Sequence, residues 1–243
     1  MARILVTGST QGIGRATAAA LLDDDHEVVV HARTDHRLAD LGDLLARGAQ
    51  SVVGDLARTD GVRGLAEQAR ELGPFDAVIH NAGVLDGPAL LPVNVVAPYV
   101  LTALVPAARV IYLSSGMHRG GTAVLSGLDW SGNRRTASYS DSKLLVTVLM
   151  AAVARRWPDV LANAVDPGWV PTRMGGPSAS DDLELGHVTQ SWLATSEDPA
   201  ALVSGSYWFH QRTRDPHPAV HDEATQDALL AALAEHTGVS LRE

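Results

Sequence analysis

The regular alternation of short apolar runs with longer helical segments constrains the fold of this chain more than any other feature. Apolar runs predict strands at residues 3–7, 28–30, 51–53, 77–79, 109–113, 160–165 and 205–209. The segments between them predict helices at 12–22, 38–47, 62–72, 93–105 and 138–156. Strands that are apolar throughout and separated by helices are typical of a parallel sheet covered on both faces. We therefore predict an α/β fold with a doubly wound parallel sheet.

Length and composition indicate one domain with one irregular region. The chain has 243 residues, of which 46% are hydrophobic, enough for one sizeable core. No linker, internal repeat or low-complexity segment divides it. Residues 171–198 are rich in Gly, Pro, Ser and Asp and follow the carboxyl end of a strand, where open α/β sheets bind ligands. This region is either an ordinary surface loop or a substrate loop, and we favour the substrate loop because long loops in compact domains are usually functional or disordered.

Charge and residue types exclude several classes of function. The formal net charge is −9 without a basic run, which argues against nucleic acid or an anionic membrane as the main partner. The absence of cysteine excludes disulfides, thiolate zinc sites, iron–sulfur clusters and a cysteine nucleophile. The ten histidines show no helical pair with a neighbouring carboxylate, so we expect no metal site. No apolar run is long enough to span a membrane and no charged leader precedes the first strand, so we expect a cytoplasmic protein.

A glycine-rich turn lies between the first predicted strand and the first predicted helix. The residues are Thr7-Gly8-Ser9-Thr10-Gln11-Gly12-Ile13-Gly14. The first glycine allows a tight turn, the second lets the backbone approach a pyrophosphate, and the third permits close packing of helix and strand. The helix N-terminus behind them offers free N–H groups to phosphates. The alternative is a merely tight turn, but the strand–turn–helix context favours dinucleotide binding.

The spacing of these glycines, with three residues between the first two, begins a resemblance to a known family. The turn resembles the T-G-x-x-x-G-x-G motif of the short-chain dehydrogenase/reductase family, which has a Rossmann-type fold. Three further motifs are similar to that family's and follow in its order, namely Asn81-Ala82-Gly83, Tyr139-Ser140-Asp141-Ser142-Lys143 and Pro167-Gly168 with Thr172. The amino-acid sequences of residues 138–145, 166–174 and 204–208 resemble those of the retinol-dehydrogenase-like branch of this family.

Tyr139 and Lys143 are candidate catalytic residues because they are four positions apart on a predicted helix and so share one face. A free phenol has a pKa near ~10 and is a poor base at neutral pH. A neighbouring ammonium favours the phenolate, so we expect Lys143 to lower the pKa of Tyr139. The pair could then pass a proton while a hydride moves to or from nicotinamide. An isolated pair of this kind would be read as a solvated surface pair, but the glycine turn favours catalysis.

Two further residues complete the catalytic set that the resemblance implies. Ser114 and Ser115 follow the fifth strand, and the family alignment makes Ser115 the residue that fixes the substrate oxygen. Ser114 is either a strand-end cap or a cofactor contact. Asn94 lies in an otherwise apolar helix, where it could simply bond the local backbone. The resemblance assigns it instead to a helix kink that holds a proton-relay water. The stretch around Asn94 is shorter than we expect, which leaves the oligomeric state open.

The end of the second strand predicts which dinucleotide is bound. An acidic residue there would bind the ribose 2′-hydroxyl of NAD, but this chain has Ala32 followed by Arg33. An unpaired guanidinium suits a 2′-phosphate, so we predict NADP(H) over NAD(H). Arg33 could instead stack on adenine or lie in solvent.

The resemblance implies contacts with the rest of the dinucleotide. The Asp55-Leu56 pair would meet the adenine, although Asp55 could also cap a helix. Asn81 would contact the central part of the cofactor, and Thr172 would bond the nicotinamide carboxamide. The full set of expected cofactor contacts is Gly8, Ser9, Gln11, Gly12, Ile13, Gly14, Arg33, Asp55, Leu56, Asn81, Ala82, Gly83, Tyr139, Lys143, Pro167, Gly168 and Thr172.

Together these features predict an NADP-dependent oxidoreductase that interconverts an alcohol and a carbonyl group on a small-molecule substrate. Trp130, Trp169, Trp192, Met117 and Met174 fall in predicted loops, where they either line an apolar pocket or pack ordinarily. One alternative is a dinucleotide-binding regulator or scaffold without turnover. Another is an epimerase or dehydratase, although such relatives usually carry a larger C-terminal substrate domain.

Overall fold

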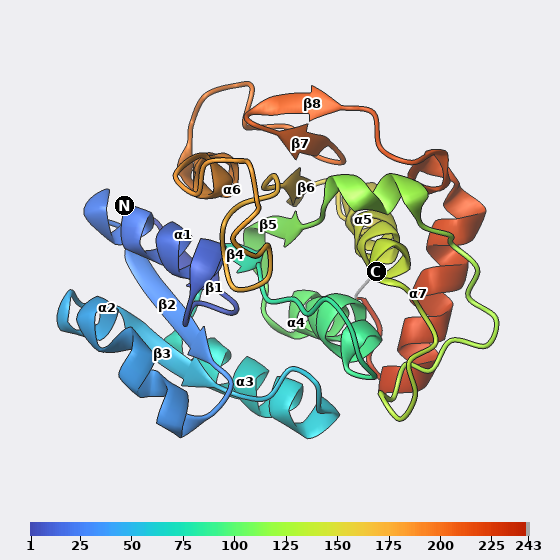
Figure 1. Cartoon of the computed structure of the whole chain (residues 1–243), viewed down its shortest axis with the longest axis horizontal. Coiled ribbons are helices and arrows are strands. Elements are labelled where there is room, and N and C mark those ends of the chain that lie inside the picture. The colour runs from blue at the N-terminus through green and yellow to red at the C-terminus, as the bar shows by residue number, and fades with distance from the viewer. Residues whose placement is uncertain (242–243) are drawn as a thin grey trace.

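Eight strands form one sheet in the middle of the molecule (Figure 1). A computed structural model describes residues 1–241 of the chain. The strand order is β3-β2-β1-β4-β5-β6-β7-β8, and every neighbouring pair is parallel except β7 and β8. The strands are β1 (Arg3–Val6), β2 (Glu27–Ala32), β3 (Gln50–Val53), β4 (Phe75–His80), β5 (Ala107–Leu113), β6 (Leu161–Asp166), β7 (Tyr207–Phe209) and β8 (Arg212–Arg214). The predicted doubly wound parallel sheet is confirmed.

Helices cover both faces of this sheet. They are α1 (Gly12–Asp23), α2 (Gly42–Ala46), α3 (Thr59–Leu72), α4 (Ala97–Leu104), α5 (Tyr139–Arg156), α6 (Leu185–Thr195) and α7 (Glu223–Thr237). One core joins the sheet to α3, α4, α5 and α7 through residues such as Leu65, Leu145 and Leu230. A second core on the opposite face joins it to α1, α2 and α6 through Leu21 and Leu193. The two cores explain why the strands are apolar on both sides.

Strand order reverses between β1 and β4, because the chain first builds outward to β3 and then resumes on the other side of β1. Ligands of open α/β sheets bind at such a switch point, beyond the carboxyl ends of the strands. The glycine turn follows β1 and the Asn81-Ala82-Gly83 motif follows β4. The topology therefore brings both motifs to the same crevice.

Several elements differ from the sequence prediction. The expected helix at 38–47 is a 3₁₀-helix over Asp35–Leu41 followed by the short α2, which begins at Gly42. The irregular region 171–198 contains α6, so Trp192 is helical and packs edge-on against Trp208. The strands and helices beyond 209 were not predicted.

The missed elements differ in the signal they offer. Strand β8 has the sequence Arg-Thr-Arg with every residue exposed, and it is paired by a tight turn through His210 and Gln211 at positive φ. Neither residue is a glycine, so the turn carries little sequence signature. Helix α7 is rich in Ala and Leu and is capped by Asp222, whose side chain accepts from the Thr225 N–H, so a signal was present there.

Helix α7 lies against α5, the helix that begins at Tyr139 (Figure 1). All residues of α5 from Ser142 to Val153 are buried. The Tyr99 hydroxyl of α4 donates to the Val239 carbonyl at 2.7 Å, and Arg63 of α3 donates to the Thr237 carbonyl at 2.8 Å. The segment around α7 is thus fixed to three neighbouring helices and covers the outer side of α5.

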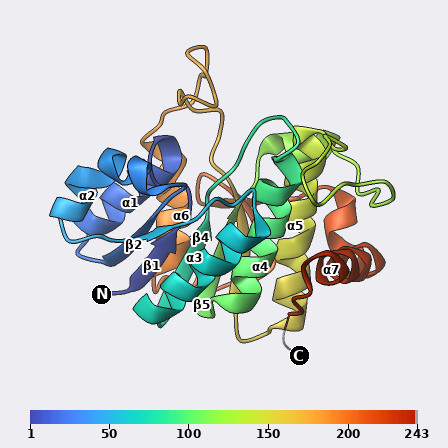
Figure 2. The ribbon, with the colours of Figure 1, turned by 90° about the horizontal axis from the view of Figure 1, so that it is seen from below.

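The loop between β6 and α6 stands out from the carboxyl ends of the strands (Figure 2). It contains Pro167, Gly168 and Thr172, and the Asp181 side chain accepts from the Trp169 N–H at 2.7 Å. No helix in residues 1–241 is both long and apolar enough to cross a membrane. The same residues contain no group of three or more His, Cys, Asp or Glu side chains suited to hold a metal ion.

Candidate active site

The glycine turn packs directly on the residues that follow β4. Gly8 and Gly12 have φ of +69° and +57°, a conformation that favours glycine. A Cβ at Gly8 would lie 2.8 Å from the Ala82 Cα, and one at Gly14 would lie 2.2 Å from the Asn81 Nδ2. No side chain fits at these positions, so the backbone of the turn itself forms one wall of the crevice.

Three polar side chains hold the turn in this shape. Asn81 Nδ2 donates to the carbonyls of Thr7 and Gly8 at 2.8 and 3.2 Å. His31 of β2 accepts from the Gly8 N–H on Nδ1 at 2.9 Å and donates from Nε2 to the Gly54 carbonyl at 2.8 Å. Burial lowers the pKa of His31, which keeps the ring neutral for this arrangement. The Ser9 hydroxyl is buried and bonds the Val6 carbonyl and the His31 N–H, so its side chain supports the turn instead of lining the groove.

A groove beside the turn brings together most of the predicted cofactor contacts. It is lined by Gly8, Gln11, Gly12, Ile13, Gly14, Arg33, Asp55, Leu56, Asn81, Ala82, Gly83 and Thr172. Thr172 lies across from Gly12, where an added Cβ would come within 3.2 Å of its methyl group. Pro167 and Gly168 instead line a neighbouring cavity. A turn with glycine at three positions, at the N-terminus of α1, fits a dinucleotide pyrophosphate.

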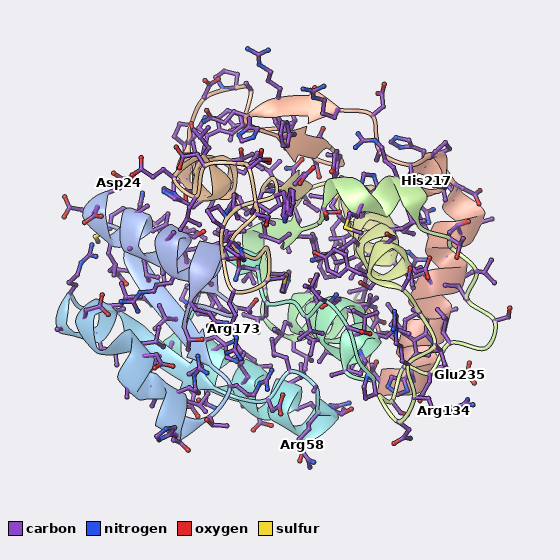
Figure 3. All side chains as sticks on the ribbon, viewed as in Figure 1. Asp24, Arg58, Arg134, Arg173, His217 and Glu235 are labelled. Atoms are coloured by element: carbon purple, nitrogen blue, oxygen red, sulfur yellow. The ribbon has the colours of Figure 1, made fainter. Side chains whose placement is uncertain are left out.

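The cations of this groove differ from the sequence prediction. Arg33 is not unpaired, because its Nε lies 3.8 Å from Asp55 Oδ1, although the Arg33 side chain remains 62% exposed. Asp55 does not cap α3, since its Oδ1 accepts from the Ala57 N–H at 3.0 Å. Arg173 also lines the groove, and sequence reasoning missed it (Figure 3). Its position next to Thr172 could have indicated it.

Ser115 follows the carboxyl end of β5, Tyr139 begins α5, and both side chains line one cavity. Ser138 caps α5 by accepting from the Asp141 N–H at 3.1 Å, while Asp141 accepts from the Ser138 N–H at 2.8 Å. This capping box starts the helix at Tyr139, whose side chain lines the same cavity as Ser115. Burial raises the pKa of Tyr139 to about 12, although the neighbouring Ser115 hydroxyl acts to lower it. The expected lowering of this pKa is therefore wrong for the structure, because desolvation prevails.

Lys143 is buried one helical turn after Tyr139. Its Nζ donates to the Leu113 carbonyl at 2.7 Å and lies 5.6 Å from the centroid of the Tyr139 ring. Burial lowers the pKa of Lys143 to about 8. The ammonium form is thus present at neutral pH, next to the phenol that it was predicted to assist.

Asn94 lies in a π-helical turn over Pro92–Val96 that precedes α4, where a kink was expected. Its Oδ1 accepts from the Val84 N–H at 2.9 Å, and its Nδ2 donates to the Val84 carbonyl and the Ser142 hydroxyl at 3.0 and 2.9 Å. A Cβ at Gly83 would come within 3.4 Å of Asn94 Oδ1 and 3.5 Å of Lys143 Nζ. The asparagine therefore joins the loop after β4 to α5 beside Lys143.

The two serines after β5 have different surroundings. Ser114 is buried, and its hydroxyl bonds the Thr147 hydroxyl at 2.7 Å, which accounts for it as a structural residue of α5 packing. Ser115 faces Tyr139 and also accepts from the Met117 N–H at 3.2 Å. His118, which sequence reasoning did not single out, donates from Nδ1 to the Ser115 carbonyl at 2.7 Å and accepts from the His217 N–H at 3.1 Å. It fixes the Ser115 segment to the chain before α7.

A cavity of about 600 Å³ opens above Tyr139 and Ser115. Met117, Trp169 and Met174 line it, together with Leu85 and Phe209, so three of the five bulky residues singled out in the sequence line this cavity. Ile13, Thr172 and Met174 line both this cavity and the groove beside the glycine turn. A molecule in the cavity would therefore lie between the Tyr139 hydroxyl and whatever occupies the adjoining end of the groove.

Comparison with known proteins identifies the family. Residues 2–183 match the family model described as short chain dehydrogenase. The chain belongs to the short-chain dehydrogenase/reductase family. It is 36% identical to an oxidoreductase of Emericella nidulans and 36% identical to the short-chain dehydrogenase chry4 of Gibberella zeae, with 99% of each chain covered in both cases. Human retinol dehydrogenase 13 is 27% identical over 99% of this chain and 86% of its own, and the chain lies in the retinol-dehydrogenase-like branch.

Solved structures of short-chain dehydrogenases and related proteins share the fold of this one. A crystal structure of a protein from Mycobacterium paratuberculosis aligns with a TM-score of 0.80 at 22% identity, covering 100% of this chain and 96% of the other. Pseudomonas aeruginosa RhlG, solved as an NADP active-site complex, aligns with a TM-score of 0.68 at 22% identity, covering 86% and 94%. This short-chain dehydrogenase is an oxidoreductase by family, and the similarity to both structures is one of fold.

Proposed function

We propose that this short-chain dehydrogenase uses NADP(H) to interconvert an alcohol and an aldehyde or ketone. The observation that carries the proposal is that Ser115 and Tyr139 both line an apolar cavity that adjoins the glycine groove. Two hydroxyls converging on one point suit a single oxygen atom of a substrate. Bound nicotinamide would supply the hydride.

The residues of the chain take distinct roles in this proposal. Ser115 orients the substrate oxygen, and Tyr139 exchanges a proton with it. With a pKa of about 12 the phenol is protonated at neutral pH, so it is ready to donate that proton during carbonyl reduction. The neighbouring Lys143 ammonium stabilises the phenolate that remains. Asn94 holds the loop after β4 against α5, and a water beside its carbonyl oxygen could return the proton to Lys143 from solvent.

The preference for NADP(H) rests on the charges that line the groove. Arg33 is largely exposed there and Arg173 lines the same groove, while Ala32 leaves the end of β2 without a carboxylate. Several structures of similar fold are NADP complexes, including a short-chain dehydrogenase from Burkholderia cenocepacia. Arg33→Ala should weaken NADPH binding by about tenfold while changing NADH binding little, because only the 2′-phosphate pairs with the guanidinium. Equal losses for the two cofactors in a calorimetric titration would refute this role.

Turnover is tested by following NADPH oxidation over a panel of aldehydes and ketones. Tyr139→Phe should abolish turnover and retain NADPH binding, since the ring stays and only the hydroxyl is lost. Tyr99→Phe is the matched control, because that hydroxyl bonds the Val239 carbonyl away from the cavity. Full activity of Tyr139→Phe would refute the mechanism. NADPH binding with no turnover across the panel would favour a regulatory or scaffold function instead.

A further inference from the structure

In the described part of the chain, the cavity beside Ser115 and Tyr139 is lined by negatively charged side chains and by no positively charged ones. Its lining contains two carboxylates, Asp166 and Asp181, and no lysine, arginine or histidine. The rest of the lining is mostly apolar, with the aromatic rings of Trp169 and Phe209 among it. A pocket of this kind repels anions and attracts a cation that carries an apolar body.

Asp166 lies beside the reacting hydroxyls. It ends β6, its Oδ1 accepts from the Gly168 N–H at 3.0 Å, and its Oδ2 accepts from the Tyr207 hydroxyl at 3.1 Å. A Cβ at Gly116, next to Ser115, would lie 3.0 Å from Asp166 Oδ2. Its charge also adds to the raised pKa of Tyr139, which places it within electrostatic reach of the phenol.

No basic side chain within residues 1–241 forms an ion pair with Asp166 or Asp181 among the contacts within 4.0 Å. The nearest cations do not face the cavity. Lys143 is buried against the Leu113 carbonyl. Arg119 and Arg214 line an adjoining pocket, which Asp166 also lines, and the Arg119 guanidinium lies over the Tyr207 ring, 5.3 Å from its centroid. The two hydrogen bonds to Asp166 come from neutral donors. A carboxylate has about four acceptor positions, so Asp166 can still accept from a ligand.

Building on the proposed function, we propose that the substrates are apolar carbonyl or alcohol compounds that carry a protonated amine, and that Asp166 selects them. The amine binds Asp166 on the β6 side of the cavity while the carbonyl faces Ser115 and Tyr139. Asp181, held against the Trp169 N–H on the β6–α6 loop, adds a second negative charge to the cavity lining. Carboxylate-bearing substrates of the same size are rejected.

Three acetophenones that differ only in their meta substituent test this proposal: aminomethyl as the cation, hydroxymethyl as the neutral probe and carboxylate as the anion. Binding is measured by calorimetry on the whole protein with and without NADPH, and turnover by NADPH oxidation. The cation should bind at least about tenfold more tightly than the anion, with the neutral compound between them. Asp166→Asn keeps acceptor atoms of the same size, and it should reduce the cation-to-anion ratio about tenfold.

Two further variants separate a local effect from a general one. Asp24→Asn removes the same charge at the exposed end of α1, far from the cavity, and should leave the ratio unchanged (Figure 3). Asp181→Asn should lower the ratio by a smaller factor, and it remains informative if Asp166→Asn unfolds in a thermal melt. The proposal is overturned by equal binding of the cation and the anion, by no measurable binding of the cation, or by an unchanged ratio in both cavity variants. A charge preference without turnover would refute the proposed oxidoreductase reaction alone, and turnover without the preference would refute the cationic substrate alone.

Discussion

The role of Asn94 as a structural joint gives a prediction whose size follows from its contacts. Asn94→Ala removes three hydrogen bonds, two to Val84 and one to Ser142, from a side chain that is 2% exposed. At about 1 kcal/mol for each bond, the variant should lose about 3 kcal/mol of unfolding free energy. For a chain of this length that corresponds to a decrease in Tm of about 6–12 °C.

The measurement is a thermal melt followed by circular dichroism, with urea unfolding to obtain the free energy. Asn133→Ala is a matched control, because Asn133 is exposed and its side chain donates only to the Ser131 hydroxyl, at 2.8 Å. Its stability should stay within about 0.5 kcal/mol of the parent. An Asn94→Ala variant that melts within about 2 °C of the parent would refute the reasoning, since the π-helical turn would then be stable without these bonds.

Three more predictions concern the turn, the core and the assembly. Gly14→Ala places a methyl group 2.2 Å from Asn81 Nδ2, so NADPH affinity measured by fluorescence titration should fall more than about tenfold. Gly64→Ala is the control, because nothing lies within 4 Å of a Cβ at that position. Similar NADPH affinities in the two variants would contradict the packing argument. Burial lowers the pKa of His80 from its ordinary value of 6.5 to about 3, so below pH 6.5 the unfolded chain binds a proton that the folded chain does not, and the free energy of unfolding decreases as the pH is lowered. His80→Gln should reduce the loss of unfolding free energy between pH 7 and 5 by about 2 kcal/mol in urea unfolding. An identical loss in the variant would show that His80 titrates normally. Because α7 covers the outer side of α5, the protein should be a monomer by light scattering after size exclusion, and a stable dimer would show that another face associates.

The sequence predicted the sheet and the positions of its motifs because these depend on local patterns. The turn at Gly8–Gly14 and the helix at Tyr139 each follow from short-range constraints, namely positive φ, close packing and a capping box. The expected helix kink at Asn94 agrees with a π-helical turn at that residue.

Other features of the site depend on tertiary contacts that no local pattern encodes. Burial raises the pKa of Tyr139, and the extent of that burial depends on the β6–α6 loop and β7, whose residues line the cavity with it. Asp55 approaches Arg33 because the two residues follow the ends of the neighbouring strands β3 and β2. His118 holds the Ser115 segment by accepting a hydrogen bond from the N–H of His217, 99 positions away. Neither the residue type of His118 nor its spacing from Ser115 indicates this supporting role in the sequence. Arg173 was the exception, since its place beside Thr172 was visible in the sequence.

The contact between α7 and α5 also bears on how the enzyme responds to dilution. In this structure the helix that carries Tyr139 and Lys143 packs against α7 of the same chain, and its residues from Ser142 to Val153 are buried. The alignment of Tyr139 with Lys143 is then an internal property of each molecule. Specific activity should therefore stay constant as the enzyme is diluted.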